Sequence, residues 1–292
     1  MSLHKKTVFT GVATALITPF QKGKIDYPAL DRLLEKQIDG CVDAILVAGT
    51  TGEGSTLSME EYRDLVQYAK EKIGGRLPLL AGCGSNATDR AITLARMLSS
   101  AGADALLSVT PYYNKASDRG LILHYQKIAE EATCPLILYS VPSRTGVKLT
   151  MTHYRVLSEH ENIVGVKEAS GDLELVDALC AECGDDLDIY TGNDHQTVAT
   201  YKLGGCGVIS VLSNVMPQEM SELCRLCKAK EFRAASQKQH ALLPYMKELF
   251  CEVNPIPVKY VAALKGLCAA EYRLPLCPPA PESAKRLQAL FY

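Results

Sequence analysis

The sequence has 292 residues, of which 47% are hydrophobic and 22% are charged, a balance typical of a globular protein with a sizeable core. Its formal net charge of −2 gives no overall field that would attract nucleic acid or an anionic membrane surface, so we expect neither partner. No run of eighteen or more apolar residues occurs, so we also expect no transmembrane helix.

The N-terminus and the cysteines bear on the cellular compartment. Met1–Lys6 lacks the apolar stretch of a signal peptide, and Met1–Leu3 fits either a native start or a cloning remnant. The 11 cysteines, an odd number in a long chain, predict reduced thiols rather than a disulfide framework. We therefore expect a cytoplasmic protein.

The chain repeats one unit: a short apolar run, a turn rich in Gly, Thr, Pro and Asn, and an amphipathic stretch. Most apolar runs are continuous rather than alternating, as expected for strands that are buried on both faces. The predicted strands are Val12–Ile17, Ala44–Ala48, Leu77–Ala81, Ala105–Val109, Pro135–Tyr139, Ile163–Lys167, Asp188–Thr191 and Gly207–Val211.

Helical patterns separate these strands. Ser58 followed by Glu61 fits a capping box, and Gly40, Gly74 and Gly102 stand where helices should end. The predicted helices include Tyr27–Ile38, Met59–Ile73, Thr88–Ser100, Arg119–Ala132 and Leu173–Cys183. Eight such units without a break in composition predict a closed (β/α)₈ TIM barrel, with a doubly wound open sheet as the alternative.

After Val211 the pattern changes to helices only. The predicted helices of this tail are Glu219–Ala229, Glu231–Leu249, Ile256–Leu267 and Pro281–Leu290. We therefore predict an α/β fold with two parts, a catalytic (β/α)₈ barrel over residues 1–230 and a C-terminal helical region over residues 231–292.

In such barrels the reactive residues follow the carboxyl ends of the strands, and the sixth apolar run ends with Lys167. Burial disfavours the charged ammonium and lowers the pKa of a lysine, which provides the free amine that attacks a carbonyl group. The alternative is a lysine whose stem passes the strand end and whose charge reaches solvent.

The other strand ends carry residues that suit an acidic ligand. The turn Gly49–Gly54 can present backbone and hydroxyl donors to an anion, or it is simply a tight turn with a helix cap. Tyr113 and Tyr139 can transfer protons or pack, and Arg144 can bind a carboxylate or be a solvated loop charge. Together with Lys167, these residues favour a Schiff-base aldolase that acts on acids.

Two other motifs carry no such prediction. Gly82–Ala87 matches the first part of a dinucleotide-binding fingerprint, but the acidic residue expected at the end of the next strand is missing. The pairs Cys180/Cys183 and Cys224/Cys227 lie in helical patterns far apart along the chain, so we predict packing thiols rather than a zinc site. We expect neither a metal nor a cofactor.

At these strand ends the sequence resembles the dihydrodipicolinate synthase / N-acetylneuraminate lyase superfamily. This resemblance implies the barrel fold and Schiff-base chemistry, and it covers almost the whole chain. The shared motifs are Gly49–Glu53, Gly82–Thr88, Thr110–Asn114, Leu138–Gly146, Gly165–Ala169, Gly204–Val211 and Asn254–Lys259.

Within the superfamily, Ser143–Gly146 resembles the synthase branch, in which the arginine holds the carboxylate of an aldehyde substrate. The resemblance implies condensation of pyruvate with L-aspartate-4-semialdehyde to 4-hydroxy-tetrahydrodipicolinate, in lysine biosynthesis. A related aldolase that acts on a sugar acid and a silent barrel that senses a keto acid are the competing hypotheses. Arg144 argues against the first, and the full set of catalytic residues argues against the second.

The resemblance also implies a role for each site residue. Lys167 forms the imine with pyruvate, Tyr139 transfers protons, and Thr50 connects Tyr139 to Tyr113 of a neighbouring subunit. The implied assembly is a homotetramer built as a dimer of dimers. The substrate-binding residues are Thr51 for the pyruvate carboxylate, Arg144 for the aldehyde, and Gly192 and Ile209 for the pocket floor.

Relatives that are inhibited by lysine bind it near the Gly49–Gly54 turn, and this chain departs from them there. Met59 and Tyr62 stand where sensitive enzymes often have histidines, and Arg90 replaces an acidic residue that would pair with the lysine amino group. Gly54, usually a serine or alanine in relatives, borders the same region.

We predict that lysine inhibits this enzyme weakly or not at all, because the attractive partner of its amino group is replaced by a cation. The measurement is the initial rate with and without millimolar lysine. Strong inhibition would contradict the prediction.

Overall fold

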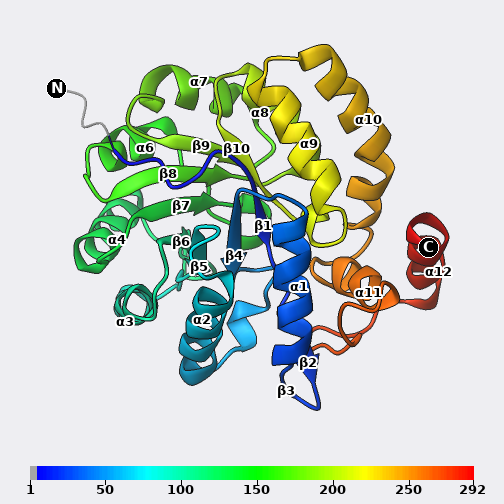
Figure 1. Cartoon of the computed structure of the whole chain (residues 1–292). Helices are drawn as coiled ribbons and strands as arrows, with labels where there is room; N and C mark the ends of the chain where they lie inside the picture. Colours follow the sequence, from blue (N-terminus) through cyan, green and yellow to red (C-terminus); the bar gives the residue numbers. More distant parts are fainter. Residues whose placement is uncertain (1–4) are drawn as a thin grey trace.

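In the computed structural model, which describes residues 5–292, eight parallel strands close into a barrel (Figure 1). The strands are β1 (Gly11–Ala15), β4 (Ala44–Val47), β5 (Leu79–Gly82), β6 (Ala105–Val109), β7 (Leu136–Ser140), β8 (Ile163–Glu168), β9 (Asp188–Thr191) and β10 (Gly207–Ser210). The last strand pairs with the first, in the register Val12 to Val208, which closes the ring. The predicted barrel is confirmed, and the open sheet is wrong. Met1–Leu3 lies outside the described residues.

Helices connect the strands and surround the barrel (Figure 1). They are α1 (Tyr27–Asp39), α2 (Met59–Ile73), α3 (Thr88–Ser100), α4 (Asp118–Glu131), α5 (Pro142–Thr145), α6 (Met151–Ser158), α7 (Leu173–Cys183), α8 (Thr197–Lys202) and α9 (Pro217–Lys228). The bounds of α2, α3 and α7 agree with the prediction at both ends, and the capping box of Ser58 and Glu61 is present. A small hairpin of β2 (Phe20–Gln21) and β3 (Lys24–Ile25) was not predicted.

Apolar side chains are buried on both faces of the sheet. One cluster fills the barrel, and a larger one lies between the strands and the helices. The residues inside the barrel include Ala13, Ala15, Ala44, Leu46, Leu80, Ala105, Leu107, Ile137, Tyr139, Val164, Tyr190 and Ile209. This two-sided burial accounts for the continuous apolar runs of the sequence.

The C-terminal region adds α10 (Phe232–Glu248), α11 (Ile256–Leu264) and α12 (Pro281–Phe291). Helix α10 packs on α8 and α9, and α12 packs on α11 and α10 (Figure 1). The division between the barrel and this helical region near residue 230 stays a prediction. Within residues 5–292, no helix has both the length and the apolar character that a membrane crossing requires.

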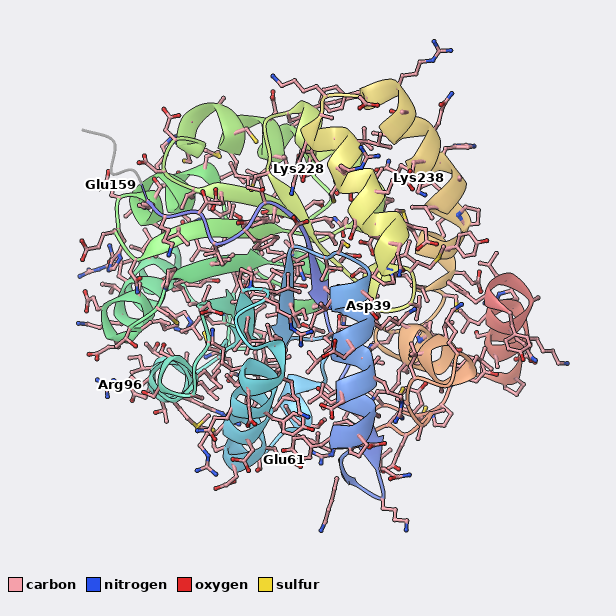
Figure 2. The ribbon with its side chains drawn as sticks, in the orientation of Figure 1. Asp39, Glu61, Arg96, Glu159, Lys228 and Lys238 are labelled. Atoms are coloured by element: carbon pink, nitrogen blue, oxygen red, sulfur yellow. The ribbon has the colours of Figure 1, made fainter. Side chains whose placement is uncertain are left out.

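Ion pairs on the outside link neighbouring helices, and Figure 2 labels Arg96 and Lys238, one member of each of two such pairs. Arg96 of α3 pairs with Glu131 of α4, and Lys238 of α10 pairs with Glu222 of α9. Because these side chains are partly exposed, such pairs contribute about 0–1 kcal/mol each to stability. Apolar burial therefore holds the outer layer in place.

Candidate active site

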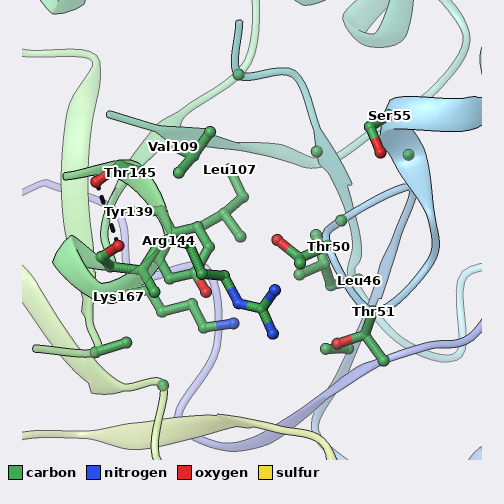
Figure 3. Close-up of a pocket in the computed structure, with 18 of the residues that line it drawn as sticks. Leu46, Thr50, Thr51, Ser55, Leu107, Val109, Tyr139, Arg144, Thr145 and Lys167 are labelled. Carbon is green, nitrogen blue, oxygen red and sulfur yellow. Dashed lines mark hydrogen bonds between the residues drawn. The ribbon is translucent and has the colours of Figure 1, made fainter. Parts of the chain in front are cut away.

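A cavity of about 570 Å³ opens at the carboxyl ends of the barrel strands (Figure 3). Six of the predicted site residues line it, and they come from four separate βα units. These residues are Thr50, Thr51, Tyr139, Arg144, Lys167 and Gly192. The closed barrel therefore brings together residues that are as many as 142 positions apart in the sequence.

Lys167 lies near the end of β8 with only 6% of its surface exposed, so the alternative of a solvent-exposed lysine is wrong. It is aligned with Tyr139 of β7 on one side and with Tyr190 of β9 on the other. Its Nζ lies 4.4 Å from the centroid of the Tyr139 ring. Burial lowers the pKa of Lys167 to about 8, an effect that Asp194 opposes and Arg144 increases. At neutral pH about one lysine in ten is therefore the free amine.

Tyr139 is the second buried ionisable group of the cavity, with 8% of its surface exposed. Burial raises the pKa of Tyr139 to about 12, although the charge of Arg144 and the hydroxyl of Thr50 act in the opposite direction. The phenol therefore keeps its proton at neutral pH and can donate it to a ligand above Lys167.

The turn after β4 places two threonines at the opposite wall of the cavity (Figure 3). It closes through hydrogen bonds from Glu53 N to Thr50 O and from Gly54 N to Gly49 O, both 3.1 Å long. Thr50 is exposed to the cavity, whereas Thr51 is buried and its Oγ1 accepts a hydrogen bond from Asn254 Nδ2 at 3.0 Å. The turn can therefore present hydroxyl and backbone donors to an anion.

Arg144 approaches the cavity from the short helix α5, and its guanidinium points toward Thr50 and Lys167 (Figure 3). One hydrogen bond, from Nη2 to Asn254 O at 3.3 Å, anchors it. Its remaining donors suit a carboxylate. The charged residues that line the cavity in the described part of the chain are Arg90, Arg144 and Lys167, so the cavity favours anions.

Two predicted residues lie elsewhere in this chain. Tyr113 is 89% exposed and is absent from the cavity wall, and Ile209 is fully buried inside the barrel, so that Val211 lines the cavity in its place. Packing explains why position 192 is a glycine, because a Cβ there would lie 2.8 Å from the Cε of Lys167.

Asn254 lines the cavity but was not among the predicted site residues. It lies between α10 and α11, is 5% exposed, and contacts both Thr51 and Arg144. Its Oδ1 lies buried at the cavity and has no partner among the described protein groups. No barrel strand precedes Asn254, so its position along the chain did not mark it as a site residue. The one sequence feature that could have done so is the shared family motif, which begins at Asn254.

The glycines of the supposed dinucleotide motif have a packing role. A Cβ at Gly82 would lie 2.4 Å from Ala48 O, and one at Gly84 would lie 2.5 Å from Val109 N. The strand ends approach each other closely because these residues have no side chain. This packing accounts for the glycines without a nucleotide.

The paired cysteines lie in helices, as predicted, in α7 and α9. Cys183, Cys224 and Cys227 are buried against the core, and Cys180 is partly buried. Within residues 5–292, no group of three or more His, Cys, Asp or Glu side chains is placed to hold a metal ion.

A family model described as "Dihydrodipicolinate synthetase family" matches residues 8–291. The chain belongs to this family. The predicted family membership is thus confirmed over nearly the whole sequence.

Named relatives agree with this assignment. The chain is 44% identical over 281 residues to the 4-hydroxy-tetrahydrodipicolinate synthase of Nitratidesulfovibrio vulgaris, covering 96% of each protein. The crystal structure of dihydrodipicolinate synthase from Aquifex aeolicus has a TM-score of 0.95 at 41% identity, with 97% of each chain covered. The Acinetobacter baumannii enzyme, solved in complex with pyruvate, has a TM-score of 0.95 at 40% identity, again with 97% of each chain covered. The predicted synthase activity agrees with these names.

Gly54 has no room for a side chain in this structure. A Cβ would lie 2.3 Å from Ala48 O and 2.6 Å from the hydroxyl of Tyr62. Tyr62 is 7% exposed and lines the cavity next to Arg90. The hydroxyl of Tyr62 therefore occupies part of the space that a side chain at position 54 would need.

We predict that Gly54→Ala lowers the free energy of unfolding by about 1–3 kcal/mol, because the backbone oxygen of Ala48 cannot move aside easily. Chemical denaturation measures this change. Gly120→Ala in α4 is the matched control, since a Cβ there meets its nearest neighbours at 3.4 Å and should cause no loss. Equal stability of the two variants would contradict the prediction.

Proposed function

We propose that this chain condenses pyruvate with L-aspartate-4-semialdehyde to 4-hydroxy-tetrahydrodipicolinate through a Schiff base on Lys167. The observation that carries this proposal is a buried lysine with a pKa lowered to about 8, in a cavity whose charged lining residues, within the described chain, are all cationic. Both substrates bring a carboxylate and a carbonyl group, which suits such a cavity.

The reaction begins when the free amine of Lys167 attacks the keto carbon of pyruvate and water leaves, which forms an imine. The imine withdraws electrons, so the methyl carbon of pyruvate loses a proton and becomes the nucleophilic carbon of an enamine. This carbon attacks the aldehyde and forms the new carbon–carbon bond. The amino group from the aldehyde substrate then displaces Lys167 and closes the ring.

The two carboxylates are assigned to opposite walls of the cavity. Thr50 and Thr51 would hold the pyruvate carboxylate, and Arg144 would hold the carboxylate of the aldehyde in a two-point contact. Gly192 would leave space for the imine beside Lys167, and Ile209 would support the pocket floor from inside the barrel. This arrangement is supported by Thr50, Arg144 and Lys167 facing one space (Figure 3).

Tyr139 would donate and accept the protons of these steps. Its phenol keeps its proton at neutral pH because burial raises its pKa to about 12. Thr50 would connect it to the hydroxyl of Tyr113 from a neighbouring subunit. The exposure of Tyr113 supports this connection, because an exposed side chain can reach the cavity of a neighbouring subunit.

We propose a homotetramer built as a dimer of dimers, in which the active site is complete only within a dimer. We also propose the cytoplasm as the location. All 11 cysteines lie in the described chain as free thiols, which supports a reducing compartment.

We predict that pyruvate and borohydride together attach a three-carbon adduct to Lys167, detectable by peptide mass spectrometry. The yield should rise with pH through a midpoint near 8, because only the neutral amine attacks and its fraction grows above the pKa. Lys167→Ala is the variant that should show no adduct.

An adduct on another lysine, or no adduct, would overturn the Schiff-base assignment. Turnover assays then decide the substrate, since aspartate semialdehyde should be consumed with pyruvate and sialic acid should not be cleaved. Cleavage of sialic acid would favour the competing lyase function.

The shared site predicts complementation between two inactive variants. Mixing Tyr113→Phe with Lys167→Ala should restore about one quarter of native activity, because half of randomly assorted dimers are hybrids with one intact site. The measurement is the initial rate after reassembly of a one-to-one mixture. A mixture as inactive as its parents, or a native protein that is monomeric by sedimentation, would contradict the shared site.

A further inference from the structure

The Gly49–Gly54 turn has a buried side that faces away from the cavity. Thr50 and Thr51 face the ligand side, whereas the side chain of Glu53 is fully buried behind them. Glu53 also has a left-handed backbone with φ of 53°, which is uncommon for a residue with a side chain. Contacts with neighbouring residues must therefore stabilise this conformation of Glu53.

The partner of Glu53 is Lys259 of α11, which lies 206 positions later in the chain. Their side chains form an ion pair with no exposed surface on either one. The Nζ of Lys259 also donates to Glu271 O at 3.0 Å and lies 4.3 Å from the centroid of the Phe20 ring. Removing two charges from water costs free energy. Only close contact between the two partners offsets this cost, so the pair depends on the geometry of both side chains.

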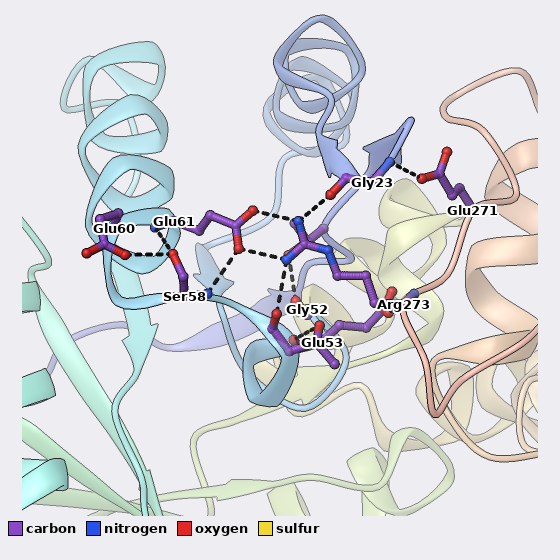
Figure 4. A network of polar contacts seen from close by, with 10 residues as sticks. Gly23, Gly52, Glu53, Ser58, Glu60, Glu61, Glu271 and Arg273 are labelled. Atoms are coloured by element: carbon purple, nitrogen blue, oxygen red, sulfur yellow. Dashed lines mark hydrogen bonds and ion pairs between the residues drawn. The ribbon is translucent and has the colours of Figure 1, made fainter.

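Arg273 extends the network from the turn to the segment that follows it (Figure 4). Its backbone N donates to the second carboxylate oxygen of Glu53 at 3.3 Å, and its guanidinium donates to Thr56 O at 3.0 Å. The same guanidinium contacts both oxygens of Glu61, at 2.7 and 2.5 Å, in the first turn of α2. Lys259 and Arg273 of the C-terminal region therefore contact both the turn and the helix that follows it.

A second contact from this segment reaches the ligand side. Asn254 donates from Nδ2 to the hydroxyl of Thr51 at 3.0 Å. Thr51 and Glu53 are thus held from opposite sides by residues on either side of the start of α11. The only charged pair that touches the turn itself is Glu53 with Lys259, among the residues the structure describes.

We propose that Glu53 and Lys259 are positioning residues for the condensation, because their buried ion pair fixes the Thr50–Thr51 turn where it meets the pyruvate carboxylate. The proposal rests on the proposed function. It gives the C-terminal helical region a part in substrate binding, although neither residue of the pair touches the substrate.

A purely structural pair and a positioning pair have different consequences. If the pair only stabilises the fold, its loss lowers the folded fraction and leaves the KM values of the folded protein unchanged. If the pair positions the turn, its loss raises the KM for pyruvate alone, because Arg144 binds the aldehyde and is anchored by Asn254 O rather than by either member of the pair.

The test is the double variant Glu53→Gln with Lys259→Met, which replaces the pair by uncharged groups of similar size. We expect the KM for pyruvate to rise by about 10-fold or more, since small displacements of positioning groups have effects of this order. The KM for the aldehyde should stay within about 2-fold. The pH midpoint of the borohydride adduct should stay near 8, because no charge that lines the cavity changes.

A conservative variant and a surface control complete the design. Glu53→Asp keeps the charge but shortens its reach, so it should fold and raise the KM for pyruvate to an intermediate value. Arg286→Gln breaks a surface pair of the same C-terminal region, with Glu248 at 2.8 Å, and should leave both KM values unchanged.

The outcomes separate this proposal from the proposed function. A native protein without an adduct on Lys167 would refute the function itself. A native adduct with an unchanged pyruvate KM in the folded variants, or with equal increases in both KM values, would refute the positioning role. If neither variant folds, the pair serves the stability of the fold, and the positioning role is refuted as well.

Discussion

Closure of the eight-stranded parallel barrel is the constraint on which the rest of the structure depends. Every strand runs in the same direction, so the carboxyl ends of all eight meet at one rim. The pairing of β7 with β8 sets Tyr139 beside Lys167, and β9 brings Gly192 against the same lysine. The residues that line the cavity are close together because the sheet closes, although they are far apart in the chain.

The rim is supported from outside the barrel. The turn that carries Thr50 and Thr51 is held on its cavity side by Asn254 and on its buried side by the pair of Glu53 and Lys259. Both supports come from the region around α11. The helical region after the barrel is therefore more than a cover for apolar surface, because its residues contact the turn that lines the cavity.

Burial and the charge of Asp194 have opposite effects on the pKa of Lys167. Burial at the strand end lowers the pKa of Lys167, and the neighbouring Arg144 lowers it further, while Asp194 limits the change. The result is an amine that is partly neutral near physiological pH. The same burial raises the pKa of Tyr139, so a protonated phenol and a partly neutral amine coexist in one cavity. Burial thus shifts the pKa values of these two groups in opposite directions.

The sequence by itself determined the barrel, the bounds of helices such as Met59–Ile73, and the candidates Lys167, Tyr139, Thr50 and Arg144. These features depend on local periodicity and on position at strand ends, which are written along the chain. Only the tertiary structure decided that Lys167 is buried, that Val211 rather than Ile209 lines the cavity, and that Asn254 and Lys259 reach the turn. Gly54 likewise needed the structure, because the atoms that exclude its side chain belong to Ala48 and Tyr62. Contacts between distant segments depend on how helices pack on the closed barrel, and no local pattern records that packing.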